Sequence, residues 1–556
     1  MHRPDLFHDT PVSLSEAARA RPLARSLGLA AALGLTAAGC AGEDPNASLR
    51  DGLPRPLDGV YLDFGPAEPD DELRALIGFP VRDREDLERA VLRLHDPSDA
   101  DFRRYFSAED WVARHAPLAE DVAEVSAWLD EHGLAVRRVA GSRLVLQVDG
   151  TVAAFNEAFG VELRTFGREN HTGGPMIYTF GLLPGTSPRA PKSVAALSPA
   201  VVSADRPADS GSLSAEGGKV VTEPPPDDLA SRTLTEIAGA YGLADLHAAG
   251  HTGRGETIGV IAGASFKLKD LQSFWTSMGV TRASPVVVEP MEPAVTRYLE
   301  TTIDIEWAGG LAPEADLVVY QAPDARNTSL VYTYTEAISR AEVSVISNSF
   351  ARREDAEAEA VRDQYDAASL MAAALGITVV AASGNSAETD TPSSSPYVTA
   401  VGGTVLLLDG QGEVVSESAW SRSGSGPALS HPMPPWQEGV VPGDHGRRGV
   451  VDLALTASTE VPYLTYYLGA WKRLGGTSLA TPTFAAIMAS VNSARRAEGL
   501  PPAGLLGPAL YRSPEVQATF RDIVEGATPF HAAGPGWDYP TGWGAPDAAG
   551  LAATLP

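Results

Sequence analysis

A serine that follows two glycines and precedes an apolar run suits nucleophilic chemistry better than any other stretch of this 556-residue chain. Gly475 and Gly476 allow a tight turn, and the apolar periodicity after Ser478 predicts a buried helix that begins near the serine. The unpaired N–H groups of a first helical turn stabilise negative charge that develops beside such a hydroxyl. We expect Pro482 at about the fourth helical position, where a missing N–H costs no hydrogen bond. An ordinary capped helix start would explain these residues equally well.

A serine nucleophile needs a base, and the best candidate is a pair of carboxylates. Glu300 and Asp304 are four residues apart, which places both on one face of a helix and close enough to share a proton. Acidic residues at this spacing usually form a solvated helix face, but this pair is surrounded by apolar side chains: Tyr298, Leu299, Ile303, Ile305 and Trp307. None of the 11 histidines has a sequence context typical of a Ser-His-Asp triad.

The elements around these residues predict an α/β fold with a parallel sheet flanked by helices. From about residue 229, apolar strands alternate with helices, a pattern typical of such folds. The expected strands are 257–262, 315–321, 343–350 and 378–385, and the expected helices are 269–278, 298–308, 329–341 and 355–375. Sites in open parallel sheets form outside the carboxyl ends of strands, so Asn385 is well placed.

The preceding residues, 57–203, predict a separate α+β domain. Helices are expected at 82–94, 119–132 and 151–159, and strands at 134–139, 143–148 and 161–166. Helices on one face of a small antiparallel sheet would account for this order. Residues 204–228 are rich in Ser, Gly, Pro and acidic residues, which predicts an exposed linker that proteases can cut.

The N-terminal region has the features of an export signal. Arg21 and Arg25 precede the apolar run 27–39, which is too short and too rich in Ala and Gly to form a stable membrane-spanning helix. It ends at Cys40, the single cysteine, in a sequence that resembles a bacterial lipoprotein processing site. We therefore expect residues 1–40 to be a lipoprotein-type signal peptide with lipidation at Cys40, and residues 41–56 to be a tether. A plain secretory signal with an incidental cysteine remains the alternative.

Composition excludes several classes of partner. With 71 acidic and 43 basic residues the formal charge is −28, which argues against binding of nucleic acid or of an anionic membrane by electrostatics. Contact with a membrane is expected only through the lipid anchor. One cysteine allows no intramolecular disulfide.

Taken together, the motifs resemble the sedolisin (serine-carboxyl peptidase) family. Glu300-x-x-x-Asp304 matches the family's carboxylate pair, the segment 476–482 its nucleophile motif, and 394–404 a core segment. The resemblance implies a subtilisin-like catalytic domain at residues 229–556 behind a ferredoxin-like, inhibitory pro-domain at 57–203. It also implies an exported zymogen that is activated by cleavage within 204–228 and acts on peptides or proteins, as an endopeptidase or a tripeptidyl-peptidase.

The resemblance also assigns roles to residues. Ser478 attacks the peptide carbonyl, Glu300 takes its proton and returns it to the leaving amine, and Asp304 orients Glu300. Asn385 takes the position that faces the oxyanion. Near the C-terminus, five residues match the family's single structural Ca²⁺ site through carboxylates and backbone carbonyls: Asp522, Ile523, Gly534, Gly536 and Asp538.

Three positions depart from the family pattern. Asn385 replaces an aspartate, Ala262 stands where relatives often carry a glutamate, and Phe350 where they often carry a tryptophan. An amide donates a hydrogen bond at any pH, which predicts activity at less acidic pH than an aspartate would allow. The departures leave open a catalytically silent family member that acts as a binding or scaffold lipoprotein. Acyl transfer or ester hydrolysis by the same serine is a further alternative.

Overall fold

The computed structural model describes residues 62–160, 162–167, 178–179, 200–205, 220–223, 225, 231–294, 296–442 and 446–556. The expected signal peptide, Cys40 and the tether lie outside the described residues, as does most of the 204–228 linker. Within the described ranges, no helix has the length and apolar character needed to cross a membrane.

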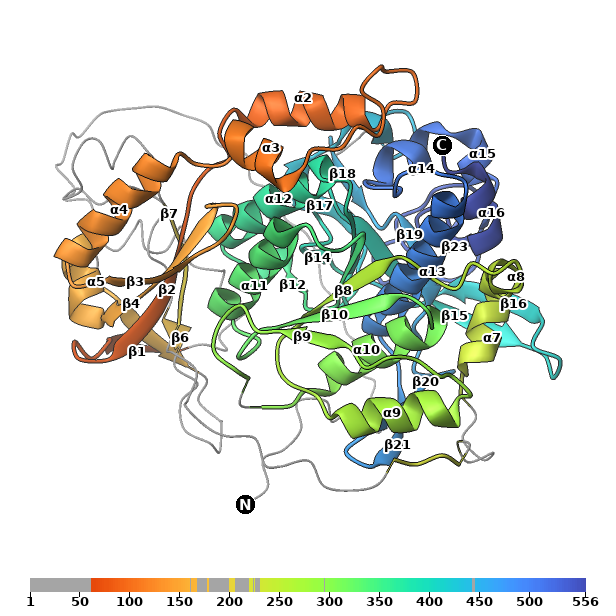
Figure 1. The fold of residues 1–556 in the computed structure, drawn as a ribbon. Coiled ribbons are helices and arrows are strands. Elements are labelled where there is room, and N and C mark those ends of the chain that lie inside the picture. Colours follow the sequence, from red (N-terminus) through yellow and green to blue (C-terminus); the bar gives the residue numbers. More distant parts are fainter. Residues whose placement is uncertain are drawn as a thin grey trace, which may run out of the picture. The chain divides into compact units, whose positions relative to one another are not determined.

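An eight-stranded sheet forms the centre of the C-terminal domain (Figure 1). Its order is β16-β15-β13-β11-β8-β10-β9, with β19 paired to β15, and every pair is parallel except β15 with β16. The strands are β8 (Thr257–Ala262), β9 (Val286–Val288), β10 (Asp316–Gln321), β11 (Val345–Asn348), β13 (Thr378–Ala382), β15 (Thr399–Leu408), β16 (Val414–Ala419) and β19 (Leu453–Thr456). The predicted parallel sheet is confirmed.

Helices cover both faces of this sheet. On one face α10 (Leu299–Leu311) packs against α13 (Thr477–Ala497), and on the other α11 (Asn327–Arg340) packs against α12 (Glu359–Ala374). The α10/α13 layer carries the predicted base and nucleophile.

One predicted helix starts later than the sequence suggests. The segment expected to be helical from residue 355 forms the 3₁₀ turn η1 (Glu354–Ala356), and α12 follows from Glu359. The buried Glu354 carboxylate accepts hydrogen bonds from the N–H groups of Leu429 and Ser430, both at 2.8 Å. This contact with a distant strand holds the chain out of the helix.

The N-terminal domain has its own sheet and its own core. The antiparallel order is β3-β4-β2-β7, and a separate cluster of apolar side chains lies between this sheet and its helices. The elements are β2 (Glu72–Gly78), α2 (Arg84–Leu94), α3 (Ala108–Arg114), α4 (Ala119–Glu131), β3 (Ala135–Val139), β4 (Val145–Thr151), α5 (Val152–Phe159) and β7 (Ala200–Asp205). They agree with the expected helices on a small antiparallel sheet.

The remaining elements are short and connect or edge these layers. They are β1 (Leu62–Pro66), β5 (Arg164–Gly167), β6 (Tyr178–Thr179), α7 (Leu234–Ala240), α8 (Leu243–Ala248), α9 (Leu268–Ser277), β12 (Arg352–Arg353), β14 (Asp390–Thr391), β17 (Gly426–Pro432), η2 (Pro435–Gln437), β18 (Arg447–Val450), β20 (Tyr463–Tyr467), β21 (Ala470–Leu474), α14 (Gly507–Arg512), α15 (Pro514–Gln517), β22 (Phe520–Arg521), β23 (Ala545–Pro546) and α16 (Ala548–Thr554).

Candidate active site

Ser478 is the second residue of α13, and only Thr477 separates it from the two glycines. Gly476 caps the helix with φ 149°, and a Cβ at this residue would lie 3.3 Å from the Asn385 amide nitrogen. A Cβ at Gly475 would lie 2.6 Å from the Thr459 nitrogen. Both glycines are therefore required by close approach, and the turn places the serine hydroxyl at the start of a long buried helix.

Pro482 lies deeper in this helix than the sequence suggests. Since α13 begins at Thr477, Pro482 is its sixth residue, and the expectation of a position near the fourth is wrong. In an α-helix the N–H of residue 482 would donate to the carbonyl of residue 478. Proline has no N–H, so the carbonyl of Ser478 loses its intrahelical donor.

The carboxylate pair lies on α10, which packs against α13. Every residue from Thr301 to Leu311 is buried, so the alternative of a solvated acidic face does not hold. Glu300 lies beside the Ser478 hydroxyl, which favours its ionised form, but burial is the larger effect and raises the pKa of Glu300 to about 7. Burial and the nearby Glu300 charge raise the pKa of Asp304 well above its ordinary value.

Each carboxylate of the pair has one oxygen with no hydrogen-bond partner among the described residues. These atoms are Oε1 of Glu300 and Oδ2 of Asp304, and both are fully buried. A buried, unpaired carboxylate oxygen is costly, and two neighbouring carboxyl groups relieve that cost when they share one proton. The geometry therefore favours a pair that carries a single negative charge near neutral pH.

Asn385 follows β13 and lies beside the start of α13. Its side-chain oxygen accepts hydrogen bonds from the Thr477 N–H at 2.9 Å and the Thr477 hydroxyl at 3.1 Å. This orientation leaves the amide N–H group of Asn385 to act as a donor next to the Ser478 backbone N–H. Gly384, with φ 102°, must be glycine because a Cβ would lie 2.2 Å from the Asp390 carboxylate.

Two of the three positions that depart from the family pattern, Ala262 and Phe350, are apolar and lie in apolar surroundings. Ala262 is fully buried at the end of β8. The ring of Phe350 packs on Gly263, where a Cβ would lie 2.6 Å from it. No further carboxyl group extends the acidic pair on this side within the described ranges.

Sequence reasoning missed one polar neighbour of the pair. Ser349 follows β11, and its hydroxyl lies 2.7 Å from Oδ1 of Asp304 and 3.2 Å from the carbonyl oxygen of Ser478. The same rule that singled out Asn385, a polar residue just beyond the carboxyl end of a parallel strand, also applies to Ser349.

The residues expected to bind calcium form a small carboxylate pair. Gly536 donates its N–H to Asp522 at 2.9 Å, and Gly534 donates to Asp538 at 2.8 Å. Burial, with a contribution from the Asp522 charge, raises the pKa of Asp538 to about 6. Neither carboxylate forms an ion pair within the described residues, and no group of three His, Cys, Asp or Glu side chains able to hold a metal is found there. Two unneutralised carboxylates beside backbone carbonyls fit a hard cation that takes oxygen ligands.

The N-terminal domain docks on the catalytic domain through a tyrosine and an arginine. Tyr105 fits against Gly376 and Gly504, where a Cβ would lie 2.2 Å and 2.5 Å from its side chain. Arg103 donates to the carbonyls of Pro502 at 2.8 Å and Ala503 at 2.6 Å. The two glycines form a socket for the Tyr105 ring, so this contact is shaped on both sides.

A buried histidine adds a hydrogen bond to this docking contact. Nδ1 of His95 bonds the Val91 carbonyl at 2.8 Å, so Nε2 accepts the N–H of Leu505 at 3.0 Å. Burial, with a contribution from the nearby Arg103 charge, lowers the pKa of His95 to about 4. The docked form therefore requires a neutral imidazole.

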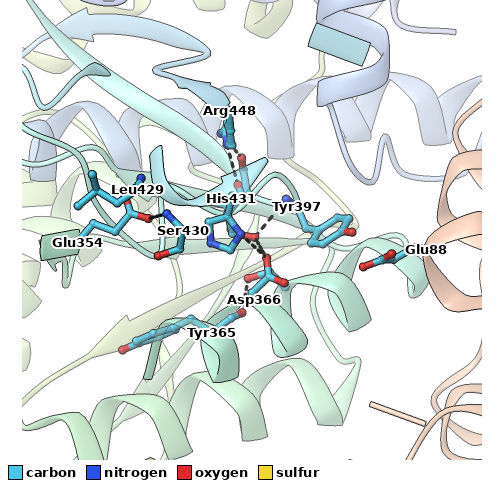
Figure 2. A network of polar contacts seen from close by, with 12 residues as sticks. Glu88, Glu354, Tyr365, Asp366, Tyr397, Leu429, Ser430, His431 and Arg448 are labelled. Atoms are coloured by element: carbon cyan, nitrogen blue, oxygen red, sulfur yellow. Dashed lines mark hydrogen bonds and ion pairs between the residues drawn. The ribbon is translucent and has the colours of Figure 1, made fainter. Parts of the chain in front are cut away.

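A second docking contact is centred on Asp366 of α12. Arg84 of α2 pairs with Asp366 Oδ2, and Ser395 donates to Asp366 Oδ1 at 2.6 Å. Figure 2 shows the Asp366 carboxylate facing the ring of His431, at 3.7 Å between Oδ1 and Nδ1. Glu88, also of α2, lies near the Tyr397 hydroxyl. The α2 helix thus contacts the catalytic domain with side chains of both charges.

Comparisons with protein families match the two domains separately. Residues 61–202 match the family described as Pro-kumamolisin, activation domain, and residues 294–544 match the subtilase family. The chain is 31% identical to kumamolisin of Bacillus sp. (strain MN-32) over 87% of this chain and 92% of that protein. It is 27% identical to sedolisin of Pseudomonas sp. (strain 101), over 86% of each chain, and 24% identical to tripeptidyl-peptidase 1 of Canis lupus familiaris, over 89% and 93%.

A solved structure gives the same picture for the catalytic part. It is Pseudomonas sedolisin (serine-carboxyl proteinase) complexed with two molecules of pseudo-iodotyrostatin. The TM-score is 0.51 at 28% sequence identity, and the match covers 58% of this chain and 97% of that one.

Proposed function

Because the chain belongs to the sedolisin family of serine-carboxyl peptidases and is a serine-type peptidase, we propose that Ser478 is its nucleophile and the Glu300/Asp304 pair its proton-transfer group. The position of Glu300 on α10 beside the Ser478 hydroxyl on α13 is the observation that carries this proposal. It aligns a base of moderately raised pKa with the proton that must leave.

The reaction follows from this arrangement. Ser478 Oγ attacks the peptide carbonyl as its proton passes to Glu300, and the carbonyl oxygen becomes an oxyanion. The Ser478 backbone N–H and the Asn385 amide stabilise that oxyanion. Glu300 then gives the proton to the leaving amine, and later takes one from the water that releases the acyl group. Asp304 shares the proton of the pair with Glu300, which prevents two adjacent buried negative charges.

The N-terminal domain acts as the inhibitory pro-domain of a zymogen. The match to a pro-kumamolisin activation domain supports this role, and the Tyr105 and Asp366 contacts supply the docking surface. Activation requires a cut between the domains, within residues 204–228. The proposal also includes export and lipidation at Cys40. It further includes one structural Ca²⁺, which Asp522 and Asp538 would hold and whose charge would offset the repulsion between their carboxylates.

The test uses the full-length precursor. Ser478→Ala is expected to leave the precursor uncut and to abolish digestion of casein, while the wild-type chain matures and digests it. If purified Ser478→Ala matured at the wild-type rate, self-cleavage would be excluded. Hydrolysis of esters without hydrolysis of peptides would favour the acyl-transfer alternative. Similarity to kumamolisin, sedolisin and tripeptidyl-peptidase 1 favours peptidase activity over a catalytically silent scaffold.

A further inference from the structure

Ser349 contacts two parts of the catalytic apparatus that the proposed mechanism treats separately. It is only 6% exposed, and its hydroxyl lies 2.7 Å from Asp304 Oδ1 and 3.2 Å from the carbonyl oxygen of Ser478. One contact reaches the carboxylate pair on α10, and the other reaches the backbone of the nucleophile on α13.

The second contact has a cause in the sequence of α13. Pro482 lacks the N–H that would bond the Ser478 carbonyl, so this carbonyl needs a donor from outside the helix. Among the described residues, the Ser349 hydroxyl stands within hydrogen-bond distance of it. The proline therefore leaves the Ser478 carbonyl without a helical donor, and a residue just after β11 can donate to it instead.

A hydroxyl has one proton and can donate to one of these acceptors at a time. When Asp304 is ionised, the short contact is best satisfied by donation from Ser349 to Oδ1. When Asp304 carries a proton on Oδ1, it donates to Ser349, whose own proton is then free for the Ser478 carbonyl. The two arrangements differ by the one proton that Asp304 exchanges with Glu300 or with solvent. Ser349 keeps its own proton and only redirects it.

We propose that Ser349 is a positioning residue that couples the protonation state of Asp304 to the backbone of the nucleophile by redirecting its single hydroxyl proton. This inference rests on the proposed role of the Glu300/Asp304 pair. Ser349 stabilises the ionised form of Asp304 in one arrangement and anchors Ser478 in the other.

Few titratable groups lie near Asp304, so few of them can influence its protonation. Glu300 on α10 is the charged group that acts on Asp304. The strand β8 carries no titratable side chain, α13 carries none before Arg495, and Asp270 of α9 acts on Glu306 instead. A change in the pH dependence of Ser349 variants therefore reports on the pair itself.

The first experiment measures kcat and KM of the mature enzyme against pH with one peptide substrate. Ser349→Ala removes a donor to ionised Asp304, so the acid limb of kcat/KM should move up by about one pH unit. At the pH optimum kcat should fall by about tenfold with little change in KM. Ser349→Thr keeps the hydroxyl and should remain close to wild type.

Ser347→Ala is the matched control. Ser347 is fully buried on β11, two residues before Ser349, and its hydroxyl has no hydrogen-bond partner within the described residues. It should alter neither the pH profile nor kcat, and thermal melting checks that all variants fold. An unshifted profile for Ser349→Ala, or the same shift for Ser347→Ala, would overturn the proposal.

The second experiment adds Pro482→Ala, which restores an N–H for the Ser478 carbonyl. In the Ser349→Ala background it should recover most of kcat while the pH shift persists. If kcat and the pH profile both returned to wild type, Ser349 would act on the nucleophile alone. If neither returned, the contact of Ser349 with the Ser478 carbonyl would have no role in catalysis. Glu300→Gln in the same assay tests the proposed function separately from the role of Ser349. Wild-type activity of Glu300→Gln would refute Glu300 as the base, whatever the Ser349 variants do.

Discussion

Two pairs of ionisable residues, each four residues apart in the sequence and each with buried charged groups, have opposite character in this protein. Arg448 and Asp452 carry opposite charges and are saturated with hydrogen bonds. The Arg448 guanidinium contacts Asp452 at 2.8 Å and 3.1 Å and binds three carbonyls of the 393–398 segment (Figure 2 shows its place). Asp452 also accepts the N–H of Ala400 at 2.8 Å and the Tyr511 hydroxyl at 2.8 Å.

Glu300 and Asp304 carry like charges and have few donors, of which the Ser349 hydroxyl at Asp304 Oδ1 is one. Each keeps one buried oxygen without a partner, and burial raises the pKa of both groups. The oppositely charged, fully hydrogen-bonded pair holds the 393–404 segment in place and contributes to stability. The carboxylate pair lacks an opposite charge and instead holds a proton that can move. Uncompensated burial is what makes a carboxylate a useful base near neutral pH.

The largest expected effect comes from removing the base. Glu300→Gln should lower kcat/KM by about a thousandfold, because an amide cannot accept the Ser478 proton. The matched control is Glu306→Gln on the same helix, whose carboxylate is buried but bonded to Thr465 and to the Tyr466 N–H. The activities of the two variants on one peptide show whether catalysis depends on burial of a carboxylate alone or on a carboxylate that also lacks hydrogen-bond partners. Equal losses in the two variants would contradict the comparison.

Breaking the compensated pair should cost stability instead. Asp452→Asn leaves Arg448 buried without its counter-charge, which should lower the free energy of unfolding by about 3–5 kcal/mol. Urea unfolding in the Ser478→Ala background avoids self-digestion. The exposed pair Arg340–Glu342 is the control, and Glu342→Gln should cost less than about 1 kcal/mol. A loss of activity without a loss of stability would reverse the assignment.

A third, smaller effect concerns the pro-domain. The pKa of His95 is lowered to about 4 when docked, so docking gains from the neutral ring fully above pH about 6.5 and loses this gain as pH falls toward 4. We expect acid to weaken docking by up to about a hundredfold through this residue. His95→Gln accepts the Leu505 N–H but cannot be protonated.

The measurement for His95 is the precursor processing rate against pH, divided by the activity of mature enzyme at the same pH. Wild-type processing should rise as pH falls below about 6.5, and His95→Gln should lose much of this rise. Identical normalised rates would show that other groups, such as the Arg84–Asp366 pair, control release.

The smallest effect is a change in the shape of the pH profile at the oxyanion. Asn385 donates at any pH, whereas the carboxyl of Asn385→Asp donates only when protonated. Activity of Asn385→Asp should therefore decline above about pH 5, while the wild type declines only where the carboxylate pair loses its shared proton. Identical profiles would mean that Asn385 does not limit the pH range.

The sequence by itself determined the elements that rest on local patterns. Apolar periodicity located β8 and α4 to within a residue or two, and spacing placed Glu300 and Asp304 on one helix face. The glycines before Ser478 indicated a turn that only glycine can form. These features depend on neighbours within about one helical turn, so they can be read along the chain.

Only the tertiary structure decided which groups are compensated. Ser349 meets Asp304 across 45 residues and Ser478 across 129, and His95 meets Leu505 across 410. Pro482 lies two positions deeper in α13 than the sequence predicts, and only the helix start shows that it removes the intrahelical donor of the Ser478 carbonyl. Hydrogen-bond partners at such separations depend on the packing of layers, which no local pattern encodes.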